Sequence, residues 1–139
     1  MSRTTVAPEG IFESRPFGFA QVTVVRTPFG RSVHVAGQVA WDADGKIVGP
    51  GDVGLQLAKS LENVGAALGT VGASLDQVGA FTLYIKQSHM KEGKAIASAL
   101  KAAFGESLPC STWIGVASLA REEFLVEVEP SAVFLPPAG

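Results

Sequence analysis

Residues 52–72 read DVGLQLAKSLENVGAALGTVG, and this stretch decides the fold. Asp52 can cap a helix here, because its carboxylate can accept a hydrogen bond from a free backbone N–H of the first turn. Gly72 is placed to end the helix. Apolar side chains recur every three or four residues in between and form one stripe, at Val53, Leu57, Leu61, Val64, Leu68 and Val71. The stretch therefore predicts an amphipathic helix with one face packed on a core.

The segments on either side of this helix predict strands. Downstream, Phe81, Leu83 and Ile85 fall on every second position, as in a strand with two distinguishable faces. Upstream, residues 20–25 and 32–36 are short runs rich in Val, and a Thr-Pro-Phe-Gly turn separates them. These two runs predict a β-hairpin.

The C-terminal part adds one more helix and two more strands. A helix is predicted over about residues 91–104, with Gly105 at its end. Residues 112–116 and 124–134 predict the strands, and the second would place Leu125 on the same side as Glu127. The order is then ββαβαββ, a mixed α/β (α+β) fold in which two helices cover one face of the sheet. An apolar second face would need a partner subunit.

The length of the chain predicts one domain. A chain of 139 residues falls within the usual size range of a single core. Pro and Gly break the polar start of the chain, so residues 1–16 are predicted to form an N-terminal arm. Residues 17–135 then form the domain, and residues 136–139 form a C-terminal tail.

Composition excludes several classes of function. Eleven Lys and Arg against thirteen Asp and Glu give a net charge of −2, so no basic face for nucleic acid is expected. Only 17% of residues are charged, below the roughly 25% of an average domain, which favours burial of surface against copies of the chain. No secretory signal and no apolar run of about 20 residues is present, which predicts a cytoplasmic protein without membrane contact. One cysteine and two scattered histidines suit neither a disulfide nor a zinc site, so no metal or cofactor is expected.

Two glutamates near the C-terminus are candidates for proton transfer. Glu127 and Glu129 lie two apart on a predicted strand, so their carboxylates point to one side, roughly 7 Å apart along the chain. In a cleft, partial burial would raise a Glu pKa towards neutrality, as a general acid or base requires. The alternative is a solvated strand face or an intersubunit ion pair. Periodicity alone favours this structural alternative.

A second set of candidates follows Pro109. Cys110, Ser111, Thr112 and Trp113 place a thiol, two hydroxyls and an indole at a strand entrance, where they could contact a small polar ligand. A nucleophilic Cys110 would need a base within hydrogen-bond reach. Nothing in the sequence places either histidine beside it, so covalent catalysis is disfavoured.

The sequence resembles the Rid (YjgF) family from about residue 19 to residue 133. Four runs match the family in order and spacing, namely residues 36–38 (AGQ), the helix with Gln56 and residues 60–64 (SLENV), residues 82–86 (TLYIK) and residues 126–133 (VEVEPSAV). The resemblance implies a chorismate-mutase-like fold and a homotrimer packed through its sheets. It also implies three small-molecule clefts, each between neighbouring subunits.

The resemblance also bears on the substrate. The best-known branch of the family hydrolyses enamines and imines to 2-oxo acids and ammonia, with an arginine that grips the substrate carboxylate in bidentate fashion. Ser111 falls at the position of that arginine, and a serine has neither its charge nor its fork of donors. Arg121 lies beyond the strand and cannot be assumed to replace it. Ordinary deamination of 2-imino acids is therefore not expected.

Other matched positions imply roles in the cleft. Glu127 falls where family members have a glutamate associated with the catalytic water. The positions expected to contact the substrate are Phe19, which replaces a cleft tyrosine, Gly37, Tyr84, Cys110, Ser111, Thr112 and Trp113. The predicted function is a Rid-like enzyme that acts on an enamine, an imine or a related carbonyl compound. The alternative is a non-catalytic trimer of the same fold that binds a small molecule or a protein partner.

Overall fold

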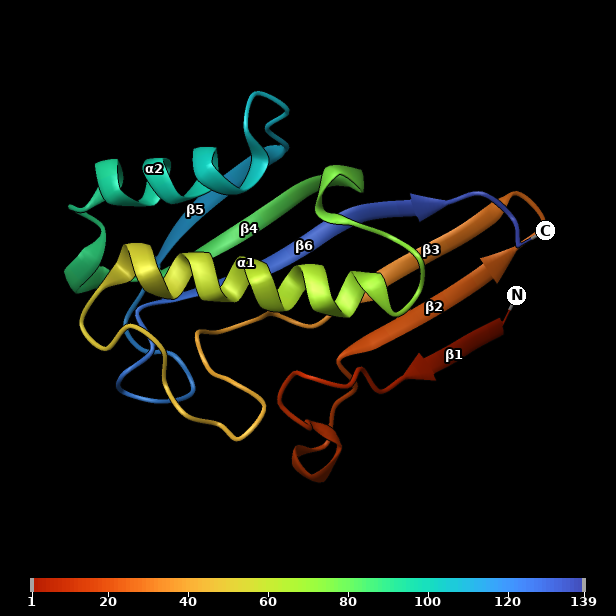
Figure 1. Ribbon diagram of the computed structural model, residues 1–139, viewed down its shortest axis with the longest axis horizontal. Helices are drawn as coiled ribbons and strands as arrows, with labels where there is room; N and C mark the ends of the chain where they lie inside the picture. The colour runs from red at the N-terminus through yellow and green to blue at the C-terminus, as the bar shows by residue number, and fades with distance from the viewer. Residues whose placement is uncertain (1, 139) are drawn as a thin grey trace.

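The computed structural model describes residues 2–138 as a twisted six-stranded mixed sheet with two helices packed on one face (Figure 1). The strands lie in the order β1-β2-β3-β6-β4-β5, and β4 and β5 are the parallel pair. The bounds are β1 Ser2–Val6, β2 Val22–Thr27, β3 Gly30–Val35, α1 Val53–Gly69, β4 Val78–Lys86, α2 Gly93–Phe104, β5 Cys110–Val116 and β6 Val126–Leu135. Short 3₁₀ turns lie at Arg15–Phe17, Leu75–Gln77 and Gln87–His89. The predicted order ββαβαββ is confirmed for β2 to β6.

Strand β1 differs from the predicted N-terminal arm over residues 1–16. It pairs antiparallel with β2 from Ser2 opposite Arg26 to Val6 opposite Val22. Thr and Val suit a strand, and the side chains are mostly exposed because β1 is an edge strand that no helix covers. The polar side chains of this segment suggested an arm, but its backbone pairs with β2 and forms a strand over Ser2–Val6. Residues 1 and 139, the ends of the predicted arm and tail, lie outside the described residues.

Helix α1 follows its sequence pattern closely. The Asp52 carboxylate accepts a hydrogen bond from the Leu55 N–H at 3.0 Å, which confirms the predicted cap. The helix ends at Gly69, before the predicted stop, because the Thr70 hydroxyl and N–H both bond the Ala67 carbonyl oxygen. Gly72 takes a φ of 78° in the turn that follows. The buried stripe includes Leu57, Leu61, Val64 and Leu68.

The core lies between the helices and the sheet. Phe81, Leu83 and Ile85 of β4 meet it with at most 4% exposure, as their alternation predicts. Burial of each such side chain contributes about 1.5–3 kcal/mol. The prediction that Leu125 shares a side with Glu127 is wrong. β6 begins only at Val126, and Leu125 packs into the core just before it.

The other face of the sheet has no helix over it in Figure 1. Its side chains alternate with the buried ones, and Tyr84 of β4 lies opposite Glu127 of β6 in the register. Ile114 and Phe134 remain 41% and 57% exposed. This helix-free face is therefore mixed in polarity rather than wholly apolar. Within residues 2–138, neither helix combines the length and hydropathy needed to cross a bilayer.

Candidate functional site

A cavity of about 520 Å³ lies where the chain leaves β3 and enters β6. It brings together Phe19, Gly37 and Glu127, three of the residues that the sequence singled out. The remaining lining residues are Phe12, Phe17, Gln21, Val39, Trp41, Asp44, Gly45, Ala120, Arg121 and Phe124. We call this space the Glu127 cavity.

Aromatic rings form one wall of the Glu127 cavity. Phe12 stacks on Trp41 with ring centroids 3.8 Å apart, and Trp41 meets Phe124 edge-on at 5.1 Å. The buried Asn63 amide donates to the carbonyl oxygens of Val39 and Trp41 at 3.0 and 2.9 Å, so α1 holds the backbone beneath the indole. The cluster of phenylalanines at positions 12, 17 and 19 was the signal that could have indicated this wall.

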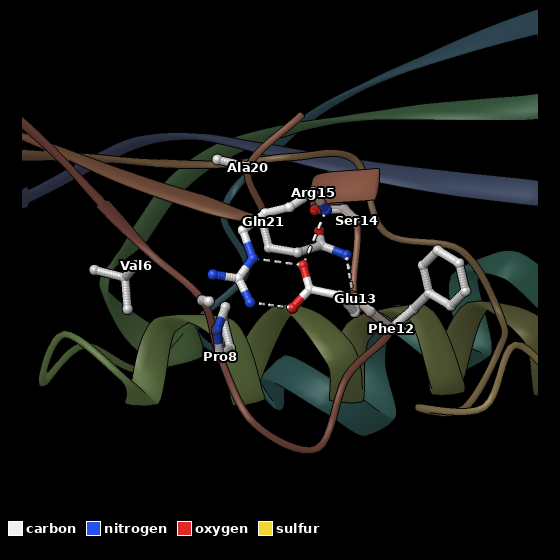
Figure 2. Close-up of a pocket in the computed structure, with 9 residues that line it drawn as sticks. Val6, Pro8, Phe12, Glu13, Ser14, Arg15, Ala20 and Gln21 are labelled. Carbon is white, nitrogen blue, oxygen red and sulfur yellow. Dashed lines mark hydrogen bonds and ion pairs between the residues drawn. The ribbon is translucent and has the colours of Figure 1, made fainter. Parts of the chain in front are cut away.

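A relay of amide side chains holds the N-terminal segment against the cavity. Gln38 Nε2 donates to Gln21 Oε1 at 2.8 Å, and Gln21 Nε2 donates to the Phe12 carbonyl oxygen at 2.9 Å. Figure 2 shows this last bond together with the Glu13–Arg15 ion pair, whose two side chains are exposed. The Ser14 hydroxyl donates to the Phe19 carbonyl oxygen at 2.7 Å and closes a turn. Both amides are buried, so Phe12 is placed by internal bonds rather than by surface contacts.

Glu127 is the ionisable group with the most unusual surroundings in the cavity. A Cβ on Gly37 would lie 2.9 Å from Glu127 Cδ, so the carboxyl group lies directly against the glycine backbone. Among residues 2–138, no donor forms a hydrogen bond or ion pair with this carboxylate. Burial raises the pKa of Glu127 above its ordinary value, and the negative charge of Glu129 adds to the effect.

Glu129 has different surroundings although it lies on the same face. It is exposed, and its Oε1 accepts a hydrogen bond from the Tyr84 hydroxyl at 3.0 Å. This bond and the charge of Glu129 raise the pKa of Tyr84. Glu129 therefore has the structural role that periodicity suggested for both glutamates. Glu127 does not.

The raised pKa of Glu127 predicts a pH-dependent stability difference. Native Glu127 holds its proton above pH 4.5, the ordinary value, so wild type loses stability as pH rises from 4.5 through the raised pKa. Glu127→Gln cannot ionise and escapes this loss. We expect the variant to have a higher Tm than wild type at pH 7, and the gain to shrink towards pH 4. A constant difference in Tm across thermal melts from pH 4 to 8 would contradict the assigned pKa shift.

The structure of one chain does not bring the residues after Pro109 to Glu127. Ser111 and Trp113 point to the helix side of β5, where both line a separate hollow of about 120 Å³ beside Leu100 of α2. The Trp113 indole N–H donates to the Ser111 hydroxyl at 3.2 Å. The sheet itself separates these side chains from Glu127, because alternate residues of a strand face opposite sides.

The other three predicted residues lie on or beside the open side of the sheet. Thr112 pairs with Thr82 on the helix-free face, and Tyr84 pairs with Glu127 there. Cys110 is an exposed free thiol at the start of the edge strand β5. Within the described part of the chain neither histidine bonds to it, and the two rings bond nearby serines instead, His34 to Ser32 and His89 to Ser88. Their predicted contacts with substrate stay predictions.

Arg121 lines the Glu127 cavity, although its place in the sequence gave no reason to expect it there. Its Nη1 donates to the Gly45 carbonyl oxygen at 3.0 Å, and its Nη2 lies 2.8 Å from Glu123 Oε2. The guanidinium carbon lies 5.8 Å from the centre of the Phe124 ring. The cavity thus holds a guanidinium, a carboxyl group with a raised pKa and a wall of aromatic rings.

Comparison with known proteins gives one consistent result. Residues 17–134 match the sequence profile of the family described as Endoribonuclease L-PSP. A RutC family protein of Pyrococcus abyssi is 31% identical over 103 residues, which cover 74% of this chain and 79% of that protein. The Rid family protein YyfB of Yersinia pestis has a solved structure that is 34% identical, with a TM-score of 0.68 over 96% of this chain and 99% of that one.

A more distant structure agrees with this fold. A member of the YjgF/YER057c/UK114 family from Mycobacterium tuberculosis is 26% identical and superposes with a TM-score of 0.74, covering 95% of this chain and 99% of that one. These neighbours confirm the predicted chorismate-mutase-like fold of two helices on a mixed sheet. The match to the family profile spans most of the chain, and the two solved structures cover nearly all of it. The chain belongs to the YjgF/Rid family, described as Endoribonuclease L-PSP.

Proposed function

We propose that this protein is a Rid-like enzyme that hydrolyses a reactive enamine, an imine or a related carbonyl metabolite. The observation that carries the proposal is Glu127, a half-buried carboxyl group with a raised pKa in an aromatic-walled cavity. A carboxyl group whose pKa moves towards working pH can both give and take a proton, which general acid–base catalysis requires.

The chemistry that Glu127 would serve is addition of water across a C=N bond. Protonated Glu127 gives its proton to an enamine carbon and forms an iminium ion. Water attacks the iminium carbon while the Glu127 carboxylate accepts the proton that the water loses. In the carbinolamine, the Glu127 carboxyl group then gives its proton to the amine nitrogen and takes the hydroxyl proton, so the C–N bond breaks and leaves a carbonyl compound and ammonia. The rings of Phe12, Trp41 and Phe124 would limit access of bulk water to the reactive intermediate.

Residues of a neighbouring copy would complete the cleft. Cys110, Ser111, Thr112 and the Trp113 amide lie on or near an edge strand, where a second chain can approach them. Ser111 stands where an arginine would bind a 2-imino acid, so this position does not supply the usual carboxylate grip. We therefore propose an activity other than that of a standard 2-imino acid deaminase.

The helix-free face supports a homotrimer packed through its sheets. Ile114 and Phe134 remain exposed on a single chain, and contact with other copies would bury them. Light scattering coupled to size exclusion should give a mass near three times the 14.4 kDa of one chain. A mass near that of one chain would contradict the proposed trimer, and with it the proposed clefts between subunits.

Gly37→Ala tests whether the position of the Glu127 carboxyl group matters. The added Cβ would lie 2.9 Å from Glu127 Cδ and push the flexible side chain aside. We expect turnover to fall at least about tenfold, since small misplacements of a catalytic group are costly. The Tm should change little, because only the end of one side chain moves. Gly69→Ala is the matched control, because its Cβ would meet nothing within 4 Å; an equal loss in both variants would contradict the prediction.

The proposed function is tested by supplying unstable substrates directly. Imines and enamines generated in situ, with and without a carboxylate, are incubated with the protein, and ammonia release is compared with the spontaneous rate. We expect at least one class to be accelerated. A panel that shows no acceleration would refute the enzyme.

A non-catalytic trimer that binds a small molecule or a protein partner is the second candidate. The observation that favours it is the serine at position 111, where the best-known branch of the family has the arginine that binds the substrate carboxylate. Calorimetry that shows reproducible ligand binding, together with no ammonia release over the same panel, would select this candidate.

A further inference from the structure

We propose that Arg121 is the anion-binding group of the Glu127 cavity, and that the ligand is an organic carboxylate with a flat, apolar body. The inference rests on the proposed function, because it names the substrate class of the same cavity. Among the described residues that line the cavity, Arg121 is the one with a permanent positive charge. This charge lies on the loop between β5 and β6 and not at position 111, so it does not restore the carboxylate grip of a standard 2-imino acid deaminase.

Two hydrogen bonds hold the guanidinium of Arg121 in place, and they use only some of its N–H donors. It has five N–H donors. The Gly45 carbonyl oxygen and the Glu123 carboxylate take one each, at 3.0 and 2.8 Å. Three donors are left, and the side chain is 43% exposed, so a ligand can reach them. A guanidinium held in one orientation loses little further freedom when it binds a planar carboxylate.

The loop that carries Arg121 is fixed from inside the protein. Gln56 of α1 donates to the Glu123 carbonyl oxygen at 2.9 Å and accepts from the Leu125 N–H at 2.9 Å. Gln56 is fully buried. These bonds set the backbone on both sides of Phe124, so the loop presents its guanidinium from a rigid base.

The charges around the cavity are compatible with an anionic ligand. Asp44 and Glu127 also line it. Burial raises the pKa of Glu127, which increases the fraction that is neutral and does not repel an anion. Glu123 is the direct competitor, because its carboxylate already pairs with the guanidinium. Removal of the Glu123 charge should therefore strengthen ligand binding.

The aromatic wall indicates the rest of the ligand. Phe12, Trp41 and Phe124 form a connected series of rings within the cavity lining. Aromatic rings attract one another beyond the effect of burying their area, so a ligand with a flat ring binds this wall more tightly than a ligand with only a methyl group. The volume of about 520 Å³ also exceeds the needs of a three-carbon acid. We infer a ring-bearing or similarly broad carboxylate.

Calorimetry with three stable probes tests this inference without any turnover. Phenylpyruvate has both the ring and the carboxylate, 1-phenylpropan-2-one lacks the carboxylate, and pyruvate lacks the ring. We expect wild type to bind phenylpyruvate at least about tenfold more tightly than either of the other two, as loss of a charge-assisted bidentate contact implies. No binding of phenylpyruvate, or equal binding of the neutral ketone, would overturn the inference.

Variants then assign the effect to Arg121. Arg121→Gln should weaken phenylpyruvate binding at least about tenfold and leave binding of the neutral ketone unaffected. The phenylpyruvate affinity of Arg121→Lys should lie between those of wild type and Arg121→Gln. Glu123→Gln should strengthen phenylpyruvate binding. Arg26→Gln, on β2 and bonded to Thr4, is the control. Unchanged phenylpyruvate affinity in Arg121→Gln would refute the inference even if imine hydrolysis depends on Glu127, whereas Arg121-dependent binding without hydrolysis would refute only the proposed enzyme.

Discussion

Glu127→Gln is expected to lower kcat for imine or enamine hydrolysis by about 100-fold or more, the usual contribution of a general acid–base. Glutamine keeps the size and polarity of the side chain but cannot give or take the proton. The amide still fits against Gly37, so the cavity keeps its shape. Ammonia release at saturating substrate measures the effect, and substrate affinity should change less than kcat.

Glu129→Gln is the matched control for this loss. Glu129 lies two residues further along β6, is exposed and bonds the Tyr84 hydroxyl. We expect its substitution to leave kcat within about threefold of wild type, since most exposed substitutions are nearly neutral. Equal losses in both variants would show that the negative charge of this face matters rather than the proton of Glu127. Full activity in Glu127→Gln would remove the residue from the mechanism.

Gln56→Leu is expected to reduce the free energy of unfolding by about 2–6 kcal/mol, because one backbone carbonyl and one N–H would be left without a partner at about 1–3 kcal/mol each. These groups are the carbonyl of Glu123 and the N–H of Leu125, whereas the carbonyl of Gly49, which the Gln56 amide also bonds, keeps its bond from the Asp52 N–H. They join α1 to the turn before it and to the loop before β6. Denaturant unfolding followed by circular dichroism measures the loss.

Ser60→Ala provides a control one helical turn away. Ser60 is also fully buried, but its hydroxyl donates only to the carbonyl of Gln56 on the same helix. Its removal should cost about 1 kcal/mol or less, the net worth of one ordinary hydrogen bond. If Gln56→Leu costs no more than Ser60→Ala, the bonds across the loop do not carry the stability assigned to them.

Local patterns predicted the parts of the fold in which each residue depends on near neighbours. The apolar stripe of α1, the Asp52 cap and the alternation of Phe81, Leu83 and Ile85 follow from helical and strand periodicity. β1 was missed because its pairing with Val22–Thr27 depends on a partner some twenty residues away. Polar side chains on an edge strand give the same sequence signal as an arm.

The candidate site was only partly predictable, because it is assembled from distant segments. Phe12, Trp41 and Arg121 meet in three dimensions, and no spacing in the sequence links them. Periodicity could not separate Glu127 from Glu129 either, since both point to the same side of β6. Burial against Gly37 distinguishes them, and it becomes visible only when β6 is aligned beside the end of β3.

Residues 7–21 form a loop whose two ends are held by the paired strands β1 and β2. β1 pairs with β2 through the register from Ser2 to Val6, and residues 7–21 return to the start of β2. This loop carries Phe12, Phe17 and Phe19, whereas Glu127 and Arg121 lie near the other end of the chain. Insertions or deletions in the loop would therefore change the size of molecule that the cavity admits while Glu127 and Arg121 stay in place. Under the proposed function, such changes would alter the choice of substrate without moving the carboxyl group that transfers the proton.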